Sequence, residues 1–220
     1  MNSPEPLIFP RGIRYPRLDE IPGGAPSDAA GRVAEAQRTP VTTGFVRIDR
    51  EGAQGYTAVV EANVHASMLW TVFVDLVTEL VPEAAAPIVG TIDEDPELGD
   101  YTRRDAAIGV LAPYADLLVN DGFLEFGCMF QRSGRTEEVF VPSAKFLRIW
   151  TNHPERAERV LARHGIPHVP GLRFIDEFPL VREAQPYGNT DTGWYAAMEE
   201  LRDKLHRLPE PPSDAQAAFQ

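Results

Sequence analysis

The densest group of ionisable side chains in the sequence is an acidic segment that also contains a proline and a glycine. Its carboxylates and the tyrosine that follows them are Asp93, Glu94, Asp95, Glu97, Asp100 and Tyr101. The spacing of an EF-hand is absent, so calcium binding of that type is not predicted. Acidic residues near a helix N-terminus are favoured by the helix dipole, but five carboxylates exceed what capping requires. We therefore predict a surface loop that contacts a basic protein partner, with a merely solvated loop as the alternative.

A second group of carboxylates belongs to an expected β-hairpin. In residues 123–130 the apolar side chains alternate, so Glu125 is expected to point away from the core, toward solvent or a groove. Glu137 and Glu138 could approach it across the hairpin, and a pair of carboxylates can perform acid–base catalysis. Like charges on exposed strands are equally explained by solubility and by protection of a sheet edge. Glu125 is thus a candidate partner contact, and a catalytic pair remains an alternative.

Other residue types with catalytic or metal-binding chemistry lack a supporting context. His164 and His168 are four residues apart, which suits two metal ligands on one helix face, but Gly165 and Pro167 break that helix. The only cysteine, Cys128, lies in an apolar run that is typical of a buried strand. Neither a glycine-rich phosphate loop nor a G-x-S-x-G motif is present. No metal, cofactor or catalytic residue is predicted.

Two adjacent aromatic residues near the start of the last expected helix are candidates for recognition. Trp194 belongs to the apolar stripe of that helix and is expected to pack on the core. Tyr195 falls off the stripe and is the more plausible surface aromatic, of a type favoured at binding hot spots. We include Tyr195 among the candidate partner-binding residues.

Composition excludes several classes of partner. The chain has 220 residues, of which 33 are acidic and 21 are basic, giving a net charge of −12. Nucleic acids and anionic membranes are held by basic residues, so neither is an expected partner. No apolar run suits a signal peptide or a membrane span, and no internal disulfide can form, so a cytoplasmic location is expected.

Hydrophobic periodicity predicts elements that alternate in type. Strands are expected in residues 44–50, 56–65, 87–92, 123–130, 138–141 continuing to 145–150, and 172–181. Helices are expected in residues 67–80, in residues 107–118 with a bend near Pro113, and in residues 192–205. A further helix is expected to begin after Asn152, which would act as a capping-box residue, and to end at Gly165. A hairpin connection is expected over residues 131–136, with a glycine at the bend.

This order predicts an α+β fold with one domain. Consecutive strands joined by short loops favour a largely antiparallel sheet, on which about four helices pack. We expect residues 1–40 to form an extended proline-rich arm with a short helical turn near residues 29–37. Residues 41–208 are the expected domain, and residues 209–220 a loose tail.

The apolar hairpin region resembles part of some bacterial immunity proteins. The residues that carry this resemblance are 117–127, 138–141, 145–146 and 174–179. Immunity proteins are encoded beside polymorphic or contact-delivered toxins and block them by direct binding. The resemblance implies a non-catalytic protein that occludes the active site of a cognate toxin, and it carries no catalytic residues.

Two alternatives to this function remain. One is a small enzyme or ligand-binding domain built around Glu125, Glu137 or Tyr101, which would require a deep pocket where polar groups converge. The other is a structural subunit that assembles through its terminal segments. The toxin hypothesis favours a partner with a basic cleft, which the acidic loop of residues 93–100 would enter.

Overall fold

The fold is built on one large antiparallel sheet. The computed structural model describes residues 5–50, 52, 55–187 and 193–211. Within these ranges, an eight-stranded sheet has the order β2-β3-β9-β8-β7-β4-β5, with β6 also paired to β4. The strands are β2 (Gly44–Asp49), β3 (Ala58–Asn63), β4 (Ala84–Thr91), β5 (Glu97–Leu98), β6 (Thr102–Arg103), β7 (Leu124–Arg132), β8 (Arg135–Val141) and β9 (Leu147–Thr151). All of their pairings are antiparallel, which confirms the prediction for the sheet.

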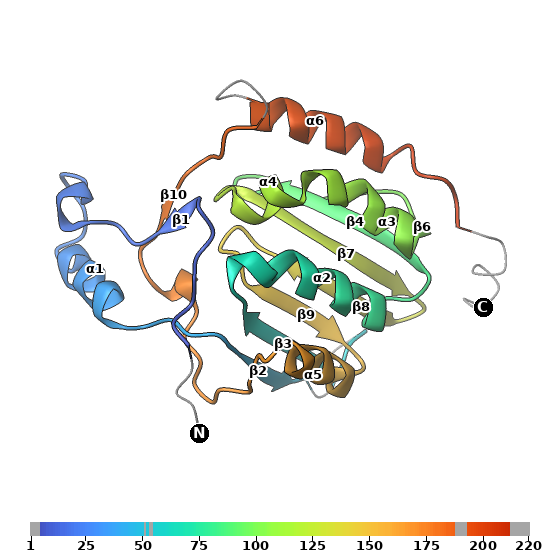
Figure 1. Ribbon diagram of the computed structural model, residues 1–220, viewed down its shortest axis with the longest axis horizontal. Coiled ribbons are helices and arrows are strands. Elements are labelled where there is room, and N and C mark those ends of the chain that lie inside the picture. The colour runs from blue at the N-terminus through green and yellow to red at the C-terminus, as the bar shows by residue number, and fades with distance from the viewer. Residues whose placement is uncertain (1–4, 51, 53–54, 188–192, 212–220) are drawn as a thin grey trace.

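Helices cover one face of this sheet. In Figure 1, the helices in front of the strands are α2 (Ala66–Leu80), α3 (Arg104–Leu111), α4 (Ala115–Asn120) and α5 (Pro154–Arg163), while α6 (Gly193–Leu205) runs along the β4 side. The apolar stripe predicted for residues 67–80 is buried, and its Phe73 ring meets that of Phe126 on β7 with centroids 5.0 Å apart. Burial of these stripes against the inner side of the sheet makes one α+β domain. None of the described helices has the length and apolarity that crossing a membrane requires.

The central strands follow the predicted hairpin and then depart from the prediction. β7 and β8 are joined by Ser133 and Gly134, both with positive φ (51° and 74°), as a tight two-residue hairpin turn requires. The expectation that residues 138–150 form one continuous run is wrong. The chain reverses after Val141, and Glu138 on β8 lies opposite Trp150 on β9. Lys145, in the connection, has a φ of 59°, a left-handed conformation that allows this second reversal.

Two further local expectations are also wrong. Asn152 does not cap α5, whose N-cap is His153 followed by Pro154 at the first helical position. The Asn152 amide instead donates to the carbonyl oxygens of Gly55 and Thr136, at 2.7 and 3.2 Å. Residues 172–181 contain a 3₁₀ turn, η3 (Ile175–Glu177), in place of a strand. Alternating apolar residues in this segment reflect packing against the N-terminal segment, because no neighbouring strand in the large sheet pairs with them.

The N-terminal segment has regular structure and packs on one end of the sheet (Figure 1). It contains β1 (Ile13–Arg14), η1 (Leu18–Glu20) and α1 (Ala29–Arg38), a full helix where a short turn was expected. β1 pairs with β10 (Val181–Arg182), and the buried Ile13 joins a small apolar cluster with Phe146 and Phe174. At the other terminus, residues 212–220 of the expected tail lie outside the described residues.

Candidate partner-binding site

The acidic loop, residues 93–100, folds back along strand β4 and supplies the edge strand β5. Its β5 pairs with β4 through Ile88 opposite Leu98 and Val89 opposite Glu97. A Cβ atom at Gly90 would lie 2.9 Å from the Cα atom of Pro96, so glycine is required for this close approach. The loop is therefore positioned by the sheet itself and extends past its edge toward α6.

Side chains of α6 and of the residue that follows it neutralise part of the acidic loop. The Arg202 guanidinium lies 2.5 Å from Glu94 and 3.5 Å from Glu97. His206 Nε2 lies 2.6 Å from Glu97 Oε1, and its Nδ1 lies 3.8 Å from Asp100. The hydrogen bond with Glu97 raises the pKa of His206, because it favours the charged imidazolium. Glu94, Glu97 and Asp100 thus hold the loop against the helix.

Asp93 and Asp95 differ from the other acidic residues of the loop. Both are exposed, and within the described ranges neither carboxylate makes a hydrogen bond or an ion pair. Their charge is therefore open to a basic partner, whereas the charges of Glu94 and Glu97 are already balanced by α6.

A groove of about 330 Å³, which we call the edge groove, lies between the acidic loop and the start of α6. Its lining residues are Thr91, Asp93, Glu94, Phe123, Ala184, Trp194, Tyr195, Met198 and Arg202. Tyr195 is 58% exposed, and its ring meets that of the partly buried Trp194 edge-on at 5.8 Å. The structure thus places Tyr195 in the same groove as Asp93 and Glu94, two acidic-loop residues that lie far from it in the sequence. Phe123 was not a candidate in the sequence, where it looked like the first residue of a core strand.

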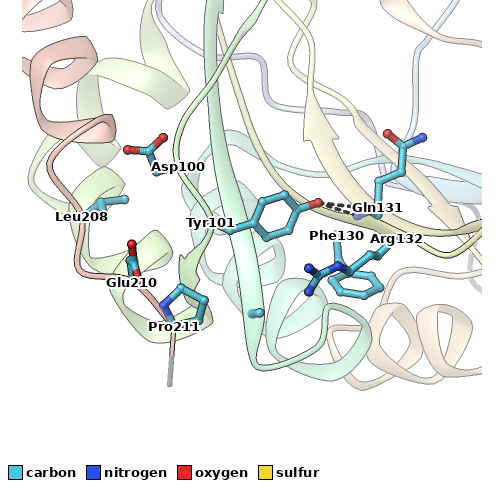
Figure 2. Close-up of a pocket in the computed structure, with 9 residues that line it drawn as sticks. Asp100, Tyr101, Phe130, Gln131, Arg132, Leu208, Glu210 and Pro211 are labelled. Carbon is cyan, nitrogen blue, oxygen red and sulfur yellow. Dashed lines mark hydrogen bonds between the residues drawn. The ribbon is translucent and has the colours of Figure 1, made fainter. Parts of the chain in front are cut away.

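Asp100 and Tyr101 line a second cavity, of about 580 Å³, beside the C-terminal segment (Figure 2). The Tyr101 side chain points toward Gln131, and Asp100 lies on the side of Leu208. The Tyr101 hydroxyl accepts a hydrogen bond from Gln131 N at 2.8 Å and donates to Gln131 O at 3.1 Å. Because both bonds go to the backbone at the end of β7, this hydroxyl anchors that strand end to the loop.

Glu125 lies apart from the residues that line both cavities, and no carboxylate pair forms around it. Glu125 accepts a hydrogen bond from Ser143 N at 3.0 Å. Glu137, which is 0% exposed, points to the opposite face of the sheet and accepts from Thr151 Oγ1 at 2.6 Å. Glu138 lies opposite Met129, four residues along β7 from Glu125. The carboxylate pair considered for acid–base chemistry is therefore not assembled.

The two histidines with metal-ligand spacing are separated by the end of α5. His164 Nε2 lies 2.8 Å from Asp75 on α2, and the His168 ring packs against Phe45. Gly165 between them has a φ of 73°, which ends the helix as the sequence predicts. Over the described part of the chain, no group of three or more His, Cys, Asp or Glu side chains could hold a metal ion.

Two titratable groups outside the edge groove have strongly perturbed pKa values. Burial lowers the pKa of Lys145 to about 7, and Asp121 and Glu125 oppose this effect. The Lys145 ammonium donates to the carbonyl oxygens of Leu118 and Leu124. Burial raises the pKa of Glu138, on the other face of the sheet from the helices, to about 7. The sequence signal for both was a charged residue inside a strongly apolar run.

Comparison with known proteins adds no family assignment. No protein-family model, no curated protein and no solved structure matches the chain.

Proposed function

We propose that this protein is a non-catalytic binding protein that neutralises a cognate bacterial toxin by direct contact, as immunity proteins do. The observation that carries the proposal is the edge groove, which is lined by both the exposed Tyr195 ring and Asp93, whose carboxylate has no ion-pair partner among the described residues. The resemblance of the hairpin region to immunity proteins and the net charge of −12 support the same function. The toxin would be bound in the cytoplasm, and its active site would be covered.

The groove suits a basic protein surface for two physical reasons. Unpaired carboxylates at Asp93 and Asp95 attract a positively charged cleft from a distance and raise the association rate. Tyr195 offers a large, rigid contact area with a hydroxyl at its end, which is typical of interface anchors. Arg202 and His206 hold the loop in place before binding, so less conformational entropy is lost on association.

Co-expression with the product of the adjacent gene, as the candidate toxin, tests this function. Under the proposal the chain restores growth of cells that produce the toxin, and the two proteins elute as one complex. Asp93→Lys combined with Asp95→Lys should slow association about tenfold or more at low salt and flatten its salt dependence. A control with the same change in charge is Asp28→Lys combined with Glu83→Lys, two exposed acids away from the groove, which should reduce association far less.

Two results would contradict parts of this proposal. If the adjacent gene product neither binds the chain nor is neutralised by it, the toxin-binding function is wrong. If binding occurs but both double variants associate at the same rate, the acidic loop is not the contact, although the function stands.

A further inference from the structure

The face of the sheet opposite α2–α5 carries a continuous row of side chains that crosses six strands. Strand register places Met129, Glu138 and Trp150 directly opposite one another on β7, β8 and β9. The row continues on one side to Ala86 and on the other to Val59 and Ile48. None of these residues belongs to the hydrophobic core beneath the helices. Ala86 and Val59 are nevertheless buried, Met129, Glu138 and Trp150 are partly exposed, and Ile48 is exposed. We call this set of six residues the Glu138 row.

The neighbouring row on the same face is already balanced in charge. Phe140 packs over Gly127, where a Cβ atom would lie 2.9 Å from the Phe140 ring. Arg148 pairs with Glu61 at 2.6 Å. The Arg148 guanidinium also lies 5.9 Å from the Trp150 ring centroid. This row therefore shows, within the protein, how a cation is held on this face by a carboxylate and an aromatic ring.

Glu138 has no such partner. Among the residues that the structure describes, its carboxylate makes neither a hydrogen bond nor an ion pair, although its cross-strand neighbours are Met129 and Trp150. Its charged form is disfavoured because the side chain is largely removed from water. A cation that arrived with a partner would relieve this cost, and the surrounding apolar side chains would cover its alkyl stem.

We propose that the Glu138 row is a docking surface for a protein partner that presents a lysine or arginine side chain within an apolar surface. The cation pairs with the Glu138 carboxylate and lies against the Trp150 ring, while the partly exposed Met129 contacts the apolar rim around it. The row shares no residue with the edge groove, so the proposal stands independently of the proposed function.

Charge argues against a second copy of the chain as the occupant. A twofold interface is self-complementary, so it would bring a second unpaired Glu138 onto the same apolar patch. Each copy also carries a net charge of −12, and like charges oppose their association. A basic side chain from a different protein is the complement that this surface lacks.

The test is a titration of the full chain with n-butylguanidinium, which carries the arginine cation on a short alkyl stem. The signal is the indole N–H resonance of Trp150, identified by its loss in Trp150→Phe. The titration is performed at about pH 8, above the pKa of Glu138, with sodium chloride matching the ionic strength. We expect n-butylguanidinium to produce a saturable shift. We expect n-butylurea, a neutral analogue of similar shape, to bind about fivefold more weakly.

Substitutions then assign the charge that is responsible. Glu138→Gln keeps the shape of the side chain and should weaken n-butylguanidinium binding about fivefold. Asp95→Asn removes an exposed carboxylate of the acidic loop and should leave that binding unchanged. Loss of the difference between these two variants would overturn the proposal.

Two further outcomes would also overturn it, and the first uses the wild type alone. One is equal binding of n-butylurea and n-butylguanidinium by the wild type, or no saturable shift up to about 100 mM. The other is self-association of the wild type in sedimentation velocity that Trp150→Ser abolishes, which would identify a second copy as the occupant.

Discussion

Lys145 shows how a single residue can be both required by the fold and costly to it. It is one of only two lysines in the chain, and it occupies a left-handed backbone position in a buried connection. Its ammonium bonds to the last turn of α4 and to the start of β7, so it joins three segments. Burial disfavours the charged form, but a lysine can release its proton, whereas an arginine in the same place would remain charged.

This residue should give the protein a distinctive dependence of stability on pH. The pKa of Lys145 is about 7 in the folded chain and 10.5 for a free lysine. Between these values the unfolded chain binds more protons, so the free energy of unfolding rises with pH. Relative to Lys145→Met, wild-type stability should therefore increase by up to about 1.4 kcal/mol per pH unit across this window.

Urea denaturation at a series of pH values measures this effect. The matched control is Lys204→Met, because Lys204 is exposed on α6 and pairs with Glu200. Its stability difference from wild type should stay constant over the same window. Parallel curves for wild type and Lys145→Met would show that Lys145 does not titrate there.

At the scale of elements, ion pairs hold the acidic loop against α6. The helix lies on the β4 side of the sheet, and Arg202 reaches from it to both Glu94 and Glu97. Among the described residues, removing this guanidinium leaves Glu94 without its cation, while Glu97 keeps only its contact with His206. The loop should then open more often, because its β5 has only two residues paired with β4.

Amide hydrogen exchange of residues 93–99 tests this coupling. Arg202→Ala should speed their exchange several-fold and lower the free energy of unfolding by about 1 kcal/mol or less, since the ion pairs are partly exposed. Arg207→Ala, which removes an exposed arginine paired with Asp203 on the same helix, should leave loop exchange unchanged. Equal exchange in the two variants would mean that the sheet alone holds the loop.

At the scale of the whole molecule, the N-terminal segment is docked by a close backbone approach. A Cβ atom at Gly12 would lie 2.4 Å from Asn120 O and 2.6 Å from Glu183 O. The backbone of Gly12 also donates to Asn120 O and accepts from Glu183 N, which links this segment to α4 and to the chain after β10. Only a residue without a side chain allows these contacts.

Gly12→Ala should therefore destabilise the protein by about 2 kcal/mol or more, because the added methyl group forces these backbones apart. Gly31→Ala makes the same chemical change in α1, where open space surrounds the glycine, and should be neutral or slightly stabilising. Urea denaturation of both variants measures the difference. If both are neutral, the N-terminal segment contributes little to the stability of the domain.

Much of the fold was predictable because its signals are local. The stripe of α2 and the alternation of β7 each lie within one segment, where the helical period or the strand period decides which side chains face the core. Positive φ at Ser133 and Gly134 is likewise a property of the turn residues themselves. The α+β class and the antiparallel sheet follow from such segments and the short loops between them.

The expectations that failed depended on partners distant in the sequence. The apolar pattern after β8 predicts a continuous run, because it does not reveal the reversal at Lys145. The segment before β10 alternates like a strand, yet its partners are N-terminal residues such as Ile13. Asn152 has the spacing of a helix cap, but its side-chain amide instead donates a hydrogen bond to Gly55 O, 97 positions earlier in the chain.

By itself, the sequence determined the element types, the α+β class and an acidic loop at the surface, because each depends on the order of residues within a short segment. Only the tertiary structure decided that Asp93 and Tyr195 line the same groove and that Arg202 neutralises Glu94. It also decided that Glu138 lies opposite Trp150 without an ion-pair partner among the described residues. These neighbours are set by strand register and helix docking, which depend on contacts between segments that are far apart along the chain.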